Sequence, residues 1–459
     1  MAHNDTPEQW VSTTLGEIVP YGKTQKCVLA DVADETWVLE LEDVEKESSR
    51  IVSRKEANER PFKSTKNRFK EGDVLYGKLR PYLNKVVVAD RDGVCSTEII
   101  PLDAEPFVFN RYLFYWLKTR DFLNYVNKVS YGVNMPRLGT KDGVVAPFVL
   151  APLAEQKAIA EKLDTLLAQV ESTKARLERI PKILKRFRQS VLAAAVSGKL
   201  TEEWCNNNGV VTCWDEVKLA DYVYSIEAGK NLKCTEIPPS ESEYGIIKIS
   251  AVTWGVYNEE ESKTLPSRDL FNENRRIKVG DLLISRANTI ELLGNPVIVR
   301  KVSKNLMLSD KVLRLVMDDD DKSWVDIYLK SPRGRKEIQS RATGNQQSMR
   351  NIGQKALLDI DIPKLADEEK SEIVRRVDQL FAYADTIETQ VNNALERVNN
   401  LTQSILAKAF RGELTEQWRK DNPDLISGEN SASALLEKIK IERAAAKPVK
   451  KAKAKVRKG

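Results

Sequence analysis

Histidine is almost absent from this chain of 459 residues, and its only copy is His3. Ser-His-Asp triads, Cys-His dyads and histidine-rich zinc sites all require a well-placed imidazole ring. The sequence also lacks GxGxxG, Walker A, HExxH and GxSxG motifs, which excludes the common nucleotide-binding loops and hydrolase nucleophiles. We therefore expect no catalytic residue, no bound cofactor and no metal site in this chain.

Cysteines are few and scattered, and long apolar runs are missing. No run of eighteen apolar residues occurs, so we expect no membrane span. The first residues lack the basic and apolar regions of a secretory signal. The five cysteines are an odd number and form no CxxC pair: Cys27, Cys95, Cys205, Cys213 and Cys234. These features predict reduced thiols and a cytoplasmic location.

The length and the charge distribution set further bounds. A chain of 459 residues is too long for one compact core, so two or more domains are expected. The net charge of +6 is modest, but residues 447–459 contain seven basic residues and no acidic one. This tail is either a disordered, solubilising segment or an arm that adds nonspecific attraction to phosphate backbones.

An apolar seam with heptad spacing occurs twice in the chain, and it organises the rest. Steps of four and three residues are typical of helices that pair as a coiled coil. Apart from a few small residues, the first seam comprises Ile159, Leu163, Leu166, Val170, Leu177, Ile180, Leu184, Phe187 and Val191. The second comprises Ile373, Val377, Leu380, Ile387, Val391, Val398, Leu401 and Ile405, each at the same offset from its counterpart in the first.

The two seams run into nearly the same words, SGKLTEEW at residues 197–204 and RGELTEQW at residues 411–418. Repetition of this quality indicates an internal duplication. Two long helices, paired as an antiparallel coiled coil, would give one chain a pseudo-twofold axis. Pro181 lies inside the first helix and is expected to bend it or to remove one hydrogen bond, whereas Leu395 stands at the equivalent place in the second.

The segments outside the helices repeat one another as well. Trp10 stands five residues before LGEI, as Trp214 stands five before LADY. A Gly-Asp turn leads into a probable strand in KEGDVLY (residues 70–76) and in KVGDLLI (residues 278–284). Each segment ends in a Gly/Asn-rich loop, residues 131–139 and 343–353. The chain is therefore predicted to be α+β, with two mixed α/β domains that are diverged copies.

The loops of these domains carry side chains suited to nucleic acid. Arginine pairs with guanine and asparagine or glutamine with adenine in the major groove, while lysine and serine hold phosphates. For any single residue, a solvated loop remains the simpler interpretation; the parallel placement in two domains favours DNA contacts for the set. The candidates are Lys78, Arg80, Tyr82, Lys85, Asn134 and Arg137 in the first domain, and Ser285, Arg286, Asn288, Asn345, Gln346, Gln347 and Arg350 in the second.

With these features the sequence resembles the DNA-specificity (S) subunits of type I restriction–modification enzymes over essentially its whole length. The similarity depends on the duplication and on specific words: PLAEQKAIAEKLDTLLAQV (residues 152–170), LKRFRQSVL (184–192), QLFAYADTIE (379–388) and SILAKAFRGEL (404–414). The helices and the C-terminal segment resemble the EcoKI-like, type IA group. The globular domains resemble target-recognition domains in their frame only.

The resemblance implies a division of the chain and a set of partners. It implies target-recognition domains at residues 1–150 and 206–361, spacer helices at 151–205 and 362–419, and a short helix with a disordered basic tail at 420–459. It implies that the chain binds one bipartite, asymmetric double-stranded DNA target, one domain to each half-site. Two methyltransferase subunits and two restriction subunits would dock on it, and S-adenosylmethionine, ATP and Mg would belong to those partners.

Two other classes of protein are alternatives to this interpretation. A stand-alone DNA-binding regulator with a coiled-coil spacer would bind its site tightly without partners. A single-chain methyltransferase or nuclease is disfavoured, because no NPPY-like or DPPY-like motif and no nucleotide-binding glycine loop occurs.

Overall fold

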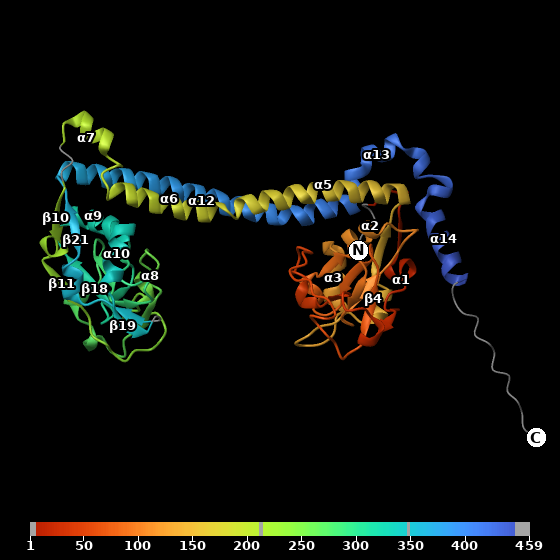
Figure 1. Ribbon diagram of the computed structural model, residues 1–459, viewed down its shortest axis with the longest axis horizontal. Helices are drawn as coiled ribbons and strands as arrows, with labels where there is room; N and C mark the ends of the chain where they lie inside the picture. Colours follow the sequence, from red (N-terminus) through yellow and green to blue (C-terminus); the bar gives the residue numbers. More distant parts are fainter. Residues whose placement is uncertain (1–5, 211–213, 347–348, 446–459) are drawn as a thin grey trace, which may run out of the picture. The chain divides into compact units, whose positions relative to one another are not determined.

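The computed structural model describes residues 6–210, 214–346 and 349–445, which form two compact units (Figure 1). Unit 1 contains Met1–Leu177 and Ala394–Gly459, and unit 2 contains Glu178–Asn393. The long helix α12 (Asp367–Phe410) contributes its first part to unit 2 and its last part to unit 1. Each unit is therefore one globular domain together with segments of both repeated helices.

The domain of unit 1 contains three small β-sheets and short helices. Strands β1 and β9 form an antiparallel pair, β2-β4-β7-β3 a four-stranded sheet, and β6-β5-β8 a three-stranded sheet. The strands are β1 (Val11–Thr14), β2 (Lys26–Cys27), β3 (Trp37–Leu39), β4 (Lys66–Phe69), β5 (Val74–Gly77), β6 (Val86–Val88), β7 (Gly93–Cys95), β8 (Ile99–Leu102) and β9 (Pro147–Leu150). The helices are α1 (Leu15–Ile18), α2 (Asn110–Trp116), α3 (Arg120–Val129) and α4 (Thr140–Val144).

The domain of unit 2 has a similar frame. Strands β10 and β21 pair, and β11-β18-β14-β16, β13-β12-β17 and β15-β20-β19 form three sheets. The strands are β10 (Asp215–Lys218), β11 (Ser225–Ala228), β12 (Tyr244–Ile247), β13 (Ser262–Thr264), β14 (Leu282–Ser285), β15 (Ala287–Asn288), β16 (Pro296–Ile298), β17 (Asn305–Met307), β18 (Val312–Val316), β19 (Thr343–Gln346), β20 (Met349–Asn351) and β21 (Asp361–Lys364). The helices are α8 (Ser250–Thr253), α9 (Asp319–Lys330), α10 (Pro332–Ser340) and α11 (Gln354–Leu358).

The Gly-Asp turn predicted in each domain has the same geometry in both. Gly72 and Gly280 adopt left-handed φ values of 88° and 89°, which only glycine reaches without strain. The following carboxylates, of Asp73 and Asp281, accept from backbone N–H groups at 2.8 Å, and each turn leads into a buried strand, β5 or β14. The domains are therefore duplicated at the level of single hydrogen bonds.

The first repeated helix is interrupted, as the position of proline predicts. It divides into α5 (Leu153–Leu177) and α6 (Ile180–Ala195), and Pro181 lies in the first turn of α6, where its missing N–H has no intrahelical partner to lose. Helix α12 continues for 44 residues through the equivalent place, where Leu395 donates normally. The repeated helices are thus not equally regular, although their seams match.

The helices pack antiparallel within each unit. In unit 1, Ile159 and Leu163 of α5 lie in one core with Leu406 and Phe410 near the end of α12. In unit 2, residues 191–196, at the C-terminal end of α6, share a core with residues 373–381 near the start of α12. The predicted pairing of the helices is confirmed.

One residue of the predicted seam lies outside it. Leu401 is 44% exposed, whereas Val398, Leu406 and Ala409 are buried. A straight α-helix turns by 3.6 residues and drifts away from a 3.5-residue repeat, so the buried face near the end of α12 no longer includes position 401. The assignment of Leu401 to the seam was therefore wrong.

Three further helices follow the repeated ones: α7 (Glu202–Asn208), α13 (Glu416–Asp421) and α14 (Ala432–Ala445). Helix α14 buries Ala432, Leu435, Leu436 and Ile439 in the core of unit 1. The basic tail at 447–459 lies outside the described residues. Among the residues described, no helix is long and apolar enough to cross a membrane.

Candidate nucleic-acid interface

A short hairpin at residues 131–137 is joined to the end of the central strand of unit 1. The Leu138 N–H donates to the Lys78 carbonyl at 3.0 Å, directly after β5. Tyr131 and Arg137 exchange backbone hydrogen bonds of 3.2 and 2.9 Å across the hairpin. The Gly/Asn-rich loop of the sequence is therefore an ordered hairpin that extends a buried strand.

Unit 2 has the same construction. The Ile352 N–H donates to the Arg286 carbonyl at 3.0 Å, directly after β14. The hairpin consists of β19 and β20, and β20 pairs with β15. Figure 1 shows β19 at the end of this domain farthest from α6 and α12.

The two hairpins share their key backbone positions. Gly132 and Gly344 have φ values of 111° and 109°, and a Cβ at either would meet the carbonyl oxygen of Met135 at 3.0 Å or Met349 at 3.1 Å. Lys78 and Arg286 each follow the four-residue strand, so both domains place a cation at the base of the hairpin. The two hairpins therefore offer equivalent side-chain positions, one set on the surface of each domain.

Some predicted residues are available for a ligand. Among the described residues, the charged groups of Lys78, Arg80 and Arg286 form no ion pair, and Tyr82 and Asn134 are exposed. Arg80 has a left-handed φ of 49°, and its N–H donates to the Pro136 carbonyl at 2.7 Å, so it is held against the hairpin. Strained, non-glycine positions of this kind concentrate at functional sites.

Other predicted residues are engaged inside the protein. The Lys85 ammonium donates to the Leu41 carbonyl at 2.7 Å, and Arg137 pairs with Glu98 at 3.2 Å. Asn288 donates to the Thr253 hydroxyl at 3.1 Å, and Arg350 donates to the Gly344 carbonyl. To contact DNA, each of these side chains would first have to break its bond within the protein.

Ser285 does not belong to the surface. Its side chain is fully buried in β14, and its hydroxyl donates to the Leu292 carbonyl at 3.1 Å. Including it was wrong, because the strand continues one residue further than the polar sequence SRAN suggests. Asn345 and Gln346 lie in β19, and Gln347 lies outside the described residues.

Sequence reasoning missed a buried carboxylate that closes each unit. In unit 1, Glu155 of α5 accepts from the Trp10 indole at 2.7 Å, from the Thr415 hydroxyl at 2.6 Å and from Arg419 at 2.6 Å. In unit 2, Glu369 of α12 accepts from the Trp214 indole at 2.9 Å and from the Thr201 hydroxyl at 3.1 Å.

The repeated words explain these contacts. Thr201 belongs to LTEEW, which follows the first repeated helix, and it closes unit 2; Thr415 belongs to LTEQW, which follows the second, and it closes unit 1. The matching spacing of Trp10 and Trp214 is the signal in the sequence that points to these contacts. Through these threonines, each repeated segment bonds to the carboxylate buried between the helices and the domain of its own unit.

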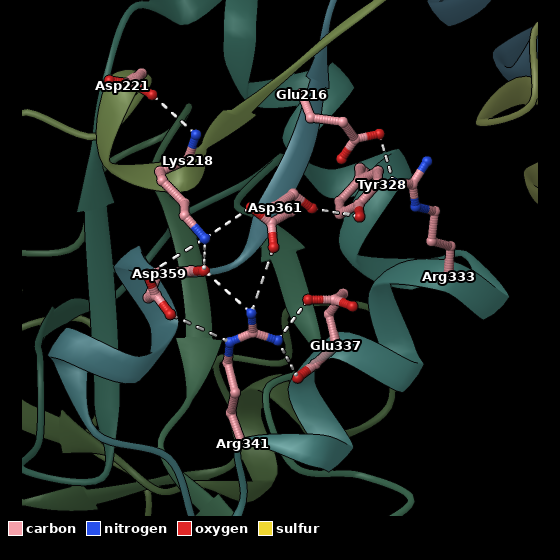
Figure 2. A network of polar contacts seen from close by, with 9 residues as sticks. All are labelled: Glu216, Lys218, Asp221, Tyr328, Arg333, Glu337, Arg341, Asp359 and Asp361. Carbon is pink, nitrogen blue, oxygen red and sulfur yellow. Dashed lines mark hydrogen bonds and ion pairs between the residues drawn. The ribbon is translucent and has the colours of Figure 1, made fainter.

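A dense cluster of ionisable groups lies at the β10–β21 ladder of unit 2 (Figure 2). Lys218 pairs with Asp361 at 2.7 Å and with Asp359 at 3.3 Å, and Arg341 lies 3.7 Å from Asp361. The hydrogen bond from Lys218 holds the pKa of the Asp361 carboxyl below its usual value. Glu216, Glu337, Asp359 and Asp361 each have a cation beside them, and Asp221 accepts from the Lys218 backbone N–H. This arrangement suits a structural network better than acid–base chemistry.

Among the described residues of unit 1, the network has no counterpart. The equivalent ladder pairs Thr14 with Pro147 where unit 2 pairs Lys218 with Asp361. Within the described ranges, no group of three or more His, Cys, Asp or Glu residues could hold a metal ion. The network therefore stabilises the domain of unit 2 and does not serve a function common to both domains.

One buried lysine lines a cavity of about 500 Å³ in unit 1. The Lys118 ammonium donates to the Ser49 hydroxyl at 2.6 Å and lies 5.0 Å from the centre of the Phe114 ring. Burial lowers its pKa to about 8, against the opposing effect of Glu171 and Glu47. The charged form is thus destabilised in the folded protein.

Lys118→Met is expected to remove a pH dependence of stability. The unfolded chain retains the proton to higher pH than the folded one, so wild-type stability rises relative to the variant between pH 8 and about 10.5. The change amounts to at most about 3 kcal/mol. Denaturant unfolding of both proteins from pH 7 to 10.5 measures it. A constant difference across this range would contradict the assignment.

The two domains share one frame, and in the described residues of each a hairpin is bonded beside a cation that forms no ion pair. The chain matches the model of the type I restriction modification DNA specificity domain over residues 7–182. It is 44% identical over 353 residues to the EcoKI specificity subunit of Escherichia coli (strain K12), covering 75% of this chain and 74% of that protein. It is 40% identical over 391 residues to the EcoBI specificity subunit of Escherichia coli, covering 79% and 78%.

A chain from a solved structure of a type I R-M system, determined to explain complex assembly and conformational transition, has the same fold. The TM-score is 0.69 and the sequences are 19% identical; the match covers 89% of this chain and 99% of that chain. The chain belongs to the family of type I restriction–modification specificity subunits. It is the DNA specificity subunit of such a system, and the similarity to the EcoKI-like group is confirmed. Subunits of this family are non-catalytic and carry no cofactor themselves.

Proposed function

We propose that the chain recognises a bipartite, asymmetric DNA target, with one domain bound to each half-site. The observation that carries the proposal is the duplicated hairpin, anchored after β5 in unit 1 and after β14 in unit 2 by the same backbone hydrogen bond. Equivalent hairpins with different side chains suit two different half-site sequences. Base edges in the major groove distinguish all four base pairs, so exposed polar side chains are sufficient to read them.

The two domains would sit on one face of B-DNA. Proteins that read two half-sites from one face place the half-site centres about one helical turn apart. The repeated helices join the two units covalently and would set the unread gap between the half-sites. Residues 1–150 and 206–361 would then carry the sequence information, and 151–205 and 362–419 the spacing.

Two methyltransferase subunits and two restriction subunits complete the proposed assembly. S-adenosylmethionine would be bound by the methyltransferase subunits, and ATP and Mg by the restriction subunits, in the cytoplasm. The outer faces of α5, α6 and α12, away from the apolar seam, offer the surface for docking. The target adenine would be extruded into a methyltransferase pocket, since a base must leave the stack before its ring can be modified.

Methylation mapping tests the proposal. Genomic DNA is sequenced from cells that contain a cognate methyltransferase subunit, with and without this chain. We expect a new N6-methyladenine motif, divided by a fixed unread gap, only when the chain is present. If the chain alone bound a defined site tightly and no new methylation appeared, it would act as the regulator considered above, and the proposal would be wrong.

A further inference from the structure

Each hairpin exposes one methionine, and in unit 1 the neighbouring Tyr131 and Val133 are exposed as well. Met135 is 48% exposed in unit 1, and Met349 is 56% exposed in unit 2. Large apolar side chains exposed singly are common on proteins and need no explanation. Here methionine stands two residues before the paired residue that ends each hairpin, Arg137 or Asn351. The exposed Tyr131 and Val133, by contrast, align with the polar Thr343 and Asn345.

The backbone fixes this position. The carbonyl of each methionine lies against a glycine, Gly132 or Gly344, so closely that any side chain on that glycine would displace it. The two glycines have nearly equal positive φ values, although two residues separate Gly132 from Met135 and four separate Gly344 from Met349. The methionine side chain therefore leaves the hairpin at an equivalent point in each domain.

A residue common to both domains is unsuited to reading what differs between two half-sites. It is suited to a feature that both half-sites possess, and the stacked bases are such a feature of all duplex DNA. Methionine is flexible, unbranched and polarisable, which lets it fit between aromatic rings. Apolar side chains, methionine among them, are known to enter base steps and to unstack them partly.

We propose that Met135 and Met349 are wedges that insert into the base stack, one at each half-site. The inference rests on the proposed function, and it assigns these residues to DNA deformation and not to base identity. The neighbouring cations support this occupant: Lys78 and Arg80 in unit 1 and Arg286 in unit 2 lie at the base of the hairpins, where they would attract phosphates. Insertion costs unstacking free energy and is repaid by the contacts that the deformed duplex allows.

The test uses the full chain with its methyltransferase subunits and two duplexes, one with 2-aminopurine in the first half-site and one with 2-aminopurine in the second. Met135→Ala is expected to reduce the fluorescence increase at the first half-site only, and Met349→Ala at the second only. Each should weaken binding about tenfold, the factor that corresponds to about 1.4 kcal/mol. The methylated sequence should stay unchanged, and Met135→Leu should restore both signals.

Val133→Ala is the matched control, since Val133 is fully exposed in the same hairpin and should leave both signals unchanged. All variants should unfold at the wild-type temperature, because neither methionine contributes to a core. The wedge assignment fails if both alanine variants bind and fluoresce within twofold of wild type. Failure of the wild-type complex to bind a split site at all would instead overturn the proposed function.

Discussion

Replacing Glu155 with alanine is expected to destabilise unit 1 by about 3–5 kcal/mol, the cost of breaking a buried ion pair by removing one partner. Glu155 is fully buried, and its carboxylate accepts from Trp10, Thr415 and Arg419. Without it, the Arg419 guanidinium and two polar hydrogens lose their partner away from water. The free energy of unfolding is measured with denaturant, and hydrogen exchange is used as the probe to follow each unit separately.

The equivalent change in unit 2 is the matched control. Glu369 is as buried as Glu155, but Cys205 stands where the first unit has Arg419, so no cation is left unpaired. Glu369→Ala is therefore expected to cost less, roughly 1–3 kcal/mol for unsatisfied neutral donors. Equal losses in both units would show that the Arg419 ion pair adds nothing to the closure of unit 1.

Arg80→Ala is expected to lower the affinity for the first half-site by about 1–3 kcal/mol, the discrimination carried by one good arginine contact to a base. Arg80 is the best placed cation in unit 1, because its backbone is bonded to the hairpin and, among the described residues, its guanidinium makes no ion pair. Competition binding with duplexes altered in one half-site at a time measures the loss.

Two further variants separate base reading from charge. Arg50→Ala removes a cation from the same domain, but Arg50 pairs with Glu45 at 2.8 Å and should change binding little. Arg286→Ala should affect the second half-site and leave the first unchanged. If Arg80→Ala weakened both half-sites equally, its contact would be with the backbone in general or with the fold, and the assignment to one half-site would be wrong.

The repeated architecture was predictable because it depends on periodicity and on repeated words. The long paired helices, the Gly-Asp turns and the helix break at Pro181 each depend on local geometry, and the structure has them as expected. Leu401 was misplaced because a heptad rule extends a 3.5-residue period along a helix that turns by 3.6.

The recognition surface was less predictable, because polarity alone does not tell which side chains are already engaged. Ser285 and Lys85 resemble DNA contacts in the sequence, yet one is buried and the other donates to the Leu41 carbonyl. The hydrogen bond from the Thr415 hydroxyl to Glu155 joins residues 260 positions apart, which no local sequence pattern reveals. The hairpins themselves were visible only as glycine-rich loops, since a hairpin is defined by its pairing partner.

In the proposed function, each hairpin serves one half of a split target. The most direct measurement is a methylation map made with the wild-type chain, with Arg80→Ala and with Arg286→Ala, each beside the same methyltransferase subunit. We predict one split N6-methyladenine motif for the wild type, relaxation of one half by Arg80→Ala and relaxation of the other half by Arg286→Ala, with the gap unchanged in all three. Relaxation of the same half by both substitutions, or an undivided motif, would contradict the claim.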